Sequence, residues 1–103
     1  MRRCIYLIEN EDNKHIKIGI GKEPTKRIKQ LQTGSSAKLK LLYQREVEFA
    51  SKVESMLHID YLDYRVHGEW FSLEGFDFQD IDNKITLYEK NFIALKSGNN
   101  PFI

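Results

Sequence analysis

Residues 16–20 read Ile16-Lys17-Ile18-Gly19-Ile20, and this alternation is typical of a β-strand with one apolar face. Successive side chains of a strand point to opposite sides, so the isoleucines share one face and Lys17 lies on the other. If that other face is solvent, Lys17 is an ordinary surface residue. If it is buried, the ammonium needs an anionic partner, because burial of an unpaired charge is costly. The strand pattern alone favours a solvent-exposed Lys17, and the other motifs of the sequence bear on whether it is buried instead.

The segments around this strand predict a hairpin followed by a helix. Residues 4–8 are a short apolar run, and the polar turn 10–13 separates them from the strand at 15–20. Gly21 breaks the pattern, and a proline at position 24 suits the first turn of a helix that runs to about residue 32. These elements lie next to one another in the chain, which favours an antiparallel pair with a helix packed on it.

The next segments complete an α+β fold. A third strand is expected over 39–49, where Leu39, Leu41 and Tyr43 alternate with polar residues. A second helix should begin near Ala50 or Ser51, and a short strand or extended segment should cover 69–73. The prediction is a β-β-α-β-α core with one further short strand.

A C-terminal amphipathic helix is predicted after Gly75. Its apolar face consists of Ile81, Ile85, Tyr88, Phe92 and Leu95, spaced as one side of a helix requires. We expect residues 1–75 to form the core and 76–103 to be a helix and tail packed on the same domain, with a loose tail from Ser97.

Charge is distributed unevenly along this 103-residue chain, whose formal net charge is only +1. Nine basic residues and one acid lie between Lys14 and Arg45, whereas eleven acids and five bases follow from Glu46 onward. Such a split predicts a protein that meets phosphate with one face, or else a lysine-rich solvated helix. The candidate DNA contacts are Lys22, Lys26, Lys29, Lys38 and Lys40.

Other classes of protein fit less well. No apolar stretch is long enough to span a bilayer, and Cys4 is the only cysteine, so a cytoplasmic protein without disulfides is expected. Gly19 and Gly21 suggest a dinucleotide-binding loop, but Pro24 stands where its third glycine should be. No organic cofactor is therefore expected, and the two glycines are interpreted as supporting a sharp turn or a close phosphate.

Glu54 and His58 lie four residues apart, on one stripe of the second predicted helix. Glu54 would suit Mg²⁺ or Mn²⁺ as a hard oxygen ligand, and His58 could contact phosphate or carry a proton. The alternative is structural, because Ser51-Lys52-Val53-Glu54 fits a capping box that would engage Glu54 with a backbone amide. Considered alone, the pair favours the cap.

Tyr6 and Glu69 are further candidates, each with a simpler explanation. Tyr6 should lie across the hairpin near Lys17, as a core aromatic or as a phenol whose ionised form a nearby cation favours. A phenolate there could accept a proton from attacking water. Glu69 could orient Arg27, Arg65 or His58, or could simply face solvent.

Several short motifs together resemble the GIY-YIG nuclease superfamily, in its compact branch common in phage and bacterial reading frames. These motifs are Cys4-Ile5-Tyr6, Lys17-Ile18-Gly19-Ile20, the segment from Arg27 to Gly34, Glu54 with Leu57-His58, and Gly68-Glu69-Trp70-Phe71. Their order over residues 4–73 carries the resemblance, although Cys4 replaces a glycine, Lys17 replaces a tyrosine, and Ile20 replaces a frequent polar group.

The resemblance implies a metal-dependent DNA endonuclease or nickase that uses one Mg²⁺ or Mn²⁺ ion. It implies Tyr6 as base or base-positioning group with Lys17 beside it, Arg27 on the phosphate oxygens, and Glu54 on the metal. His58 and Glu69 match residues typical of the compact branch. A homodimer or a separate targeting protein would supply specificity. The alternative is a catalytically silent domain that binds nucleic acid or a host protein.

Overall fold

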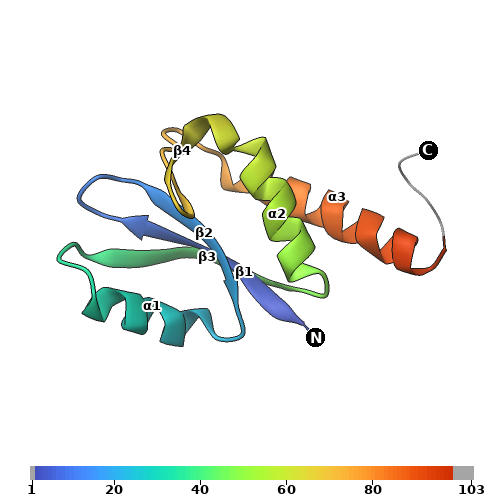
Figure 1. Ribbon diagram of the computed structural model, residues 1–103, viewed down its shortest axis with the longest axis horizontal. Coiled ribbons are helices and arrows are strands. Elements are labelled where there is room, and N and C mark those ends of the chain that lie inside the picture. Colours follow the sequence, from blue (N-terminus) through green and yellow to red (C-terminus); the bar gives the residue numbers. More distant parts are fainter. Residues whose placement is uncertain (1, 99–103) are drawn as a thin grey trace.

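The computed structural model describes residues 2–98 and contains a five-stranded sheet with helices on both faces (Figure 1). The elements are β1 (Arg3–Asn10), β2 (Ile16–Gly21), α1 (Pro24–Thr33), β3 (Leu39–Val47), α2 (Ala50–Asp60), the 3₁₀ turn η1 (Leu62–Tyr64), β4 (Arg65–His67), β5 (Trp70–Phe71) and α3 (Phe78–Lys96). The predicted α+β fold class is confirmed, including the C-terminal helix. Most of the predicted tail, residues 99–103, lies outside the described residues.

The sheet is antiparallel, and its strand order is β3-β1-β2-β5-β4. In the β1–β2 hairpin, Tyr6 is opposite Gly19 and Ile8 is opposite Lys17. The hairpin forms because the Asn10 side chain accepts hydrogen bonds from the backbone amides of Asp12 and Asn13, which closes the polar turn.

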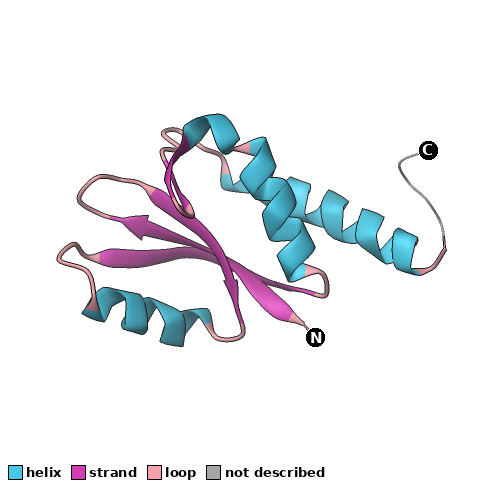
Figure 2. Ribbon diagram, viewed as in Figure 1, coloured by secondary structure: helices cyan, strands magenta, loops and turns pink. Residues whose placement is uncertain are grey.

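The two faces of the sheet carry different helices (Figure 2). On one face, Ile5, Leu7 and Ile18 pack in the main core, which includes buried residues of α2 and α3. On the other face, Tyr6 and Ile8 form a smaller cluster with apolar residues of α1 and with Trp70. The strand period of two thus sends alternate residues of β1 into two separate cores.

Three sequence expectations are corrected by the structure. A β-bulge opposite Leu7 and Ile8 places Leu41 in the small cluster and Tyr43 against the main core, so their predicted shared face is wrong. The expected break at 65–68 includes strand β4. Leu95, expected on the apolar face of α3, is 40% exposed because the last turns of α3 extend beyond the sheet (Figure 1).

Polar contacts fix α3 to the rest of the domain. The Tyr43 hydroxyl donates to Asp82 at 2.7 Å, and Arg45 bonds the same carboxylate at 3.1 Å. Burial and the Asp82 carboxylate raise the pKa of Tyr43 to about 12, so this phenol remains a donor at neutral pH. The Glu89 carboxylate accepts from the amides of Glu48 and Phe49, and so joins α3 to the turn before α2.

Candidate functional site at the open edge of strand β2

Strand β2 has one edge that is only partly covered. Strand β5 pairs with it at Ile16 and Lys17 alone, and the Ile18 amide donates to the Glu69 carbonyl just before β5 begins. Figure 1 shows the β4–β5 hairpin beside only one end of β2. From Gly19 to Gly21 no strand covers this edge within the described part of the chain. Side chains from both faces of the sheet can therefore meet there.

Tyr6 reaches this edge from the α1 side of the sheet. Its ring lies over Gly19, where an added β-carbon would come within 2.6 Å of the ring carbon Cζ and of the hydroxyl oxygen. Only glycine leaves that space, so Gly19 allows the tyrosine to lie across β2. Tyr6 is 2% exposed, which fixes its ring firmly in the small cluster.

Lys17 is not a solvent residue. Its side chain is 11% exposed, and its ammonium forms an ion pair with Glu69 at 2.8 Å. The same ammonium lies 5.8 Å from the centre of the Trp70 ring, a favourable cation–π distance. The solvent interpretation of the strand pattern is therefore wrong, and the anionic partner that burial requires is Glu69.

Glu54 approaches the edge from the opposite side, on α2. One of its carboxylate oxygens, Oε2, is buried without a hydrogen-bond partner, the only such side-chain atom among residues 2–98. Burial and the nearby Glu69 raise the pKa of Glu54, while His58, Lys17 and Arg3 act in the opposite direction. Buried polar atoms are usually hydrogen-bonded, so this unsatisfied oxygen indicates a position suited to a partner from outside the chain.

The capping-box expectation for Glu54 is wrong. Helix α2 has Phe49 at its N-cap, and no side chain caps that end. Ser51 lies inside the first turn instead of preceding the helix, so the sequence pattern Ser-x-x-Glu is displaced from the geometry that a capping box needs.

His58 lies one turn further along α2 and contacts the open edge directly. Its Nε2 is 3.0 Å from the carbonyl oxygen of Ile18, and its ring packs edge-on against Phe71. Since a carbonyl can only accept, Nε2 carries the hydrogen and donates it. In the neutral ring, Nδ1 is then left as an acceptor for another proton.

The donor set around Glu54 suits a hard divalent cation held by few protein ligands. No cluster of three or more histidine, cysteine or acidic side chains occurs within residues 2–98, so a fully protein-built metal cage is absent there. Mg²⁺ commonly binds through one or two carboxylates and keeps several waters or phosphate oxygens. The unsatisfied oxygen of Glu54 fits that mode of binding.

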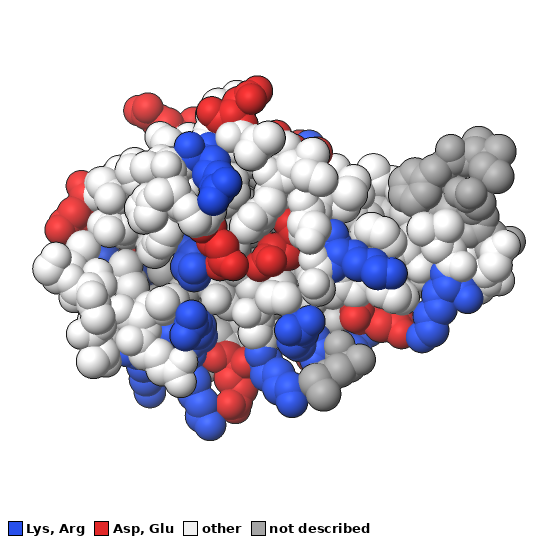
Figure 3. All heavy atoms as spheres, in the orientation of Figure 1, with Lys and Arg blue, Asp and Glu red and all other residues white. Residues whose placement is uncertain are grey.

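The predicted basic residues lie mainly outside this cluster. Arg27 is exposed on α1 and hydrogen-bonds Gln30, and within the described residues no hydrogen bond joins it to Glu54 or Lys17. All five predicted lysines are exposed: Lys22, Lys26, Lys29, Lys38 and Lys40. Lys22, Lys26 and Lys29 precede or belong to α1 and are named here, with Arg27, the α1 surface. Lys40 stands between Leu39 and Leu41, which pack toward α1, so its side chain points to the other face of the sheet. In Figure 3, basic side chains gather along the lower border, where Figure 1 places α1, and others surround acidic groups near the centre.

The structure places one further residue, Arg3, near the site. Arg3, on the first residue of β1, is close enough to influence the Glu54 carboxyl. The sequence carried no signal for it, because the preceding Arg2 looks identical in pattern. In the structure Arg2 instead pairs with Glu46 at 2.8 Å.

Comparison with known proteins gives one family. The family model of the T5orf172 domain matches residues 3–87, and no curated protein and no solved structure matches significantly. This domain is nuclease-associated and DNA-binding-like, and it is associated with endonuclease-like proteins. None of the helices described here is long and apolar enough to cross a membrane.

The match overturns the GIY-YIG assignment. T5orf172 is a distinct family, and no GIY-YIG model matches the chain. The resemblance rested on short motifs, the longest of eight residues, and three positions already departed from the pattern: Cys4, Lys17 and Ile20. Such short strings recur on unrelated strands and helices, so their order alone was insufficient.

Proposed function

The chain belongs to the T5orf172 domain family, and we propose from this premise that it is a DNA-directed phosphodiester hydrolase. The supporting observation is the unpartnered, buried oxygen of Glu54 at the open edge of β2. It lies in the same neighbourhood as two cations and a histidine, a combination that suits a phosphate and an attacking water.

Glu54 would hold one divalent metal ion, Mg²⁺ or Mn²⁺. When bound, such an ion supplies positive charge to a phosphate oxygen and lowers the barrier for hydrolysis. Burial and the neighbouring Glu69 raise the pKa of Glu54, because both disfavour an unpaired negative charge there. A bound cation would compensate that charge.

The other side chains take roles that follow from their contacts. His58 would accept the proton of the attacking water at Nδ1, because its Nε2 is occupied by the Ile18 carbonyl. The Tyr6 hydroxyl, fixed over Gly19, would orient that water. Lys17, while still paired with Glu69, would also donate to a non-bridging phosphate oxygen. Arg27 and the rest of the α1 surface would contact the DNA backbone on either side of that phosphate.

A nicking experiment tests this function. Supercoiled plasmid is incubated with the protein and Mg²⁺ or Mn²⁺, and parallel reactions contain EDTA or the variants His58→Gln and Tyr6→Phe. We expect metal-dependent nicking that EDTA abolishes. Loss of a general base should lower the rate by about 10²-fold or more in His58→Gln, with a smaller loss in Tyr6→Phe. A larger loss of rate in Tyr6→Phe than in His58→Gln would assign the role of general base to Tyr6.

A second function is favoured by the Lys17–Glu69 ion pair. Because Glu69 neutralises Lys17 at this edge, the alternative is a silent site in a domain that binds DNA only through the α1 surface. In that case the protein binds DNA with a strong salt dependence and leaves the plasmid intact with every metal.

A further inference from the structure

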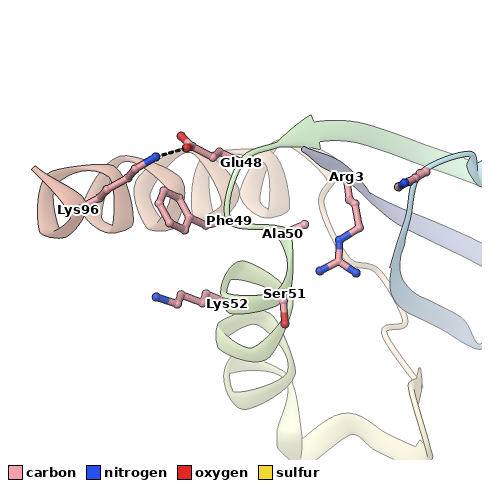
Figure 4. Close-up of a pocket in the computed structure, with 8 residues that line it drawn as sticks. Arg3, Glu48, Phe49, Ala50, Ser51, Lys52 and Lys96 are labelled. Atoms are coloured by element: carbon pink, nitrogen blue, oxygen red, sulfur yellow. Dashed lines mark hydrogen bonds and ion pairs between the residues drawn. The ribbon is translucent and has the colours of Figure 1, made fainter. Parts of the chain in front are cut away.

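A cavity of about 530 Å³ lies beside the candidate site, where the start of α2 faces the beginning of β1 and the end of β2. Four basic side chains line it, and they come from four separate parts of the chain: Arg3, Lys22, Lys52 and Lys96. Figure 4 shows Arg3 reaching from β1 toward Ser51, with Lys52 and Lys96 on the other side beside the ring of Phe49.

The balance of charge in this cavity is positive. Glu48 is its one acidic lining residue, and that carboxylate is paired with Lys96 at 2.7 Å. Within residues 2–98, Arg3, Lys22 and Lys52 have no acidic ion-pair partner. Three cations thus remain uncompensated around one hollow, which favours an anionic occupant.

The start of α2 adds donors to the same cavity. Ala50, Ser51 and Lys52 belong to the first turn, whose amides have no carbonyl partner within the helix. The Glu89 carboxylate satisfies only the two preceding amides, those of Glu48 and Phe49. Free amides and the positive end of the helix dipole both attract a phosphate group.

The cavity and Glu54 lie on the same helix, α2. Ser51 precedes Glu54 by three residues, which is about one turn of the same helix. Arg3 lines the cavity and is also close enough to Glu54 to influence its carboxyl. A strand whose scissile phosphate lies at Glu54 would therefore bring a neighbouring phosphate to this hollow.

We propose that the cavity binds a backbone phosphate of the DNA strand next to the phosphate that is cut, held by Arg3 and the first-turn amides of α2. Lys52, beside the Phe49 ring, adds positive charge from the other side of the cavity. This assignment rests on the proposed function. It adds the path of the DNA strand, which would run past the start of α2 toward Lys22 and the rest of the α1 surface.

The decisive variant is Ser51→Glu. A carboxylate in the first turn of α2 would occupy the cavity near Arg3 and would also favour the helix, so folding is retained. We expect DNA binding to weaken while thermal stability is equal to or higher than that of the native protein. Ser51→Gln has similar size without the charge and should bind as the native protein does.

Binding is measured in EDTA by fluorescence anisotropy with a labelled duplex of about 20 base pairs over a range of salt concentrations. Loss of one phosphate contact should reduce the slope of log K against log salt by about 0.9 in Ser51→Glu and by at least as much in Arg3→Gln/Lys52→Gln. Lys84→Gln/Lys90→Gln removes the same charge from α3 and should leave the slope nearly unchanged. Equal slopes in all four variants would overturn the proposal.

Amide chemical shifts identify the anion. Micromolar DNA should shift the amides of Ser51 and Lys52, whereas inorganic phosphate at the same concentration should not. Saturation by micromolar inorganic phosphate, with no response to DNA, would instead assign the cavity to a small free anion and contradict the proposal. Nicking that needs Glu54, together with unchanged slopes, would reject this cavity while leaving the proposed hydrolase intact.

Discussion

The ring of Tyr6 occupies the space that a side chain at Gly19 would need. The two residues are opposite each other in the β1–β2 ladder, and an added β-carbon at Gly19 would lie 2.6 Å from both the Tyr6 hydroxyl oxygen and Cζ. This contact is the means by which a residue of the inner strand β1 reaches the open edge of β2.

Gly19→Ala is expected to displace the tyrosine. Because Tyr6 is buried against α1 and cannot move freely, the extra methyl group should lower the free energy of unfolding by about 1–3 kcal/mol. Nicking should fall more than the loss of folded protein explains. Gly21→Ala is the matched control, because its β-carbon would lie 3.6 Å from Tyr6 Cε2, an ordinary contact. Equal effects of the two substitutions, measured by urea denaturation, would contradict this view.

Glu54→Gln should stabilise the protein at neutral pH. The folded pKa of Glu54 is raised by burial and by Glu69, so the folded state holds its proton to higher pH than the unfolded chain does. The free energy of unfolding therefore decreases as the pH rises from the ordinary glutamate pKa through the raised one. Above that window the ionised carboxylate costs stability, and below it the cost is absent.

The corresponding measurement compares melting temperatures of the native protein and Glu54→Gln. The variant should melt higher at about pH 7.5, and the difference should vanish near about pH 3.5. Mn²⁺ should raise the melting temperature of the native protein and not that of the variant. A variant that is less stable than the native protein at neutral pH would show that Glu54 has a structural partner.

The Lys17–Glu69 ion pair should contribute more than a surface pair does. Its lysine is 11% exposed, so removal of Glu69 would leave a largely buried ammonium without its carboxylate. A double-mutant cycle with Lys17→Met and Glu69→Gln should give a coupling of about 1–3 kcal/mol. The Arg2–Glu46 pair, whose side chains are 56% and 60% exposed, serves as the comparison. Its coupling energy should be under about 1 kcal/mol. Similar couplings in both cycles would refute the distinction.

Glu89 should be required for the turn that leads into α2. Its carboxylate accepts from the amides of Glu48 and Phe49, and Glu89→Ala would leave both partly buried donors without that acceptor. A loss of about 2–4 kcal/mol in the free energy of unfolding is expected, with a smaller loss in Glu89→Gln, which keeps one acceptor. Chemical denaturation measures both, and a neutral Glu89→Ala would show that water replaces the carboxylate.

The sequence predicted the fold more completely than it predicted the site. Residue periodicity was sufficient for the hairpin, for α1 and for the start of α2, because those elements bury one face each. Periodicity failed at β3, because the bulge between Leu41 and Tyr43 places their side chains on different faces of the sheet. A bulge depends on pairing between strands, which no local pattern reports.

The site depended even more on tertiary structure. The partner of Lys17 is Glu69, 52 residues away, and their contact arises from the pairing of β2 with β5. The capping-box pattern at Ser51 and Glu54 was misleading because the helix begins two residues earlier than that motif requires, with Phe49 at the N-cap. Arg3 gains its position only from the register of β1, so sequence spacing could not separate it from Arg2.

The role of Glu54 is tested by comparing the initial nicking rates of the native protein and Glu54→Gln in Mg²⁺, after a melting curve has confirmed that the variant is folded. We expect a loss of about 10²-fold or more in Glu54→Gln. Glu74→Gln, an exposed glutamate away from the site, should retain the native rate. Nicking by Glu54→Gln at the native rate would contradict the role of Glu54 and, with it, the proposed hydrolase.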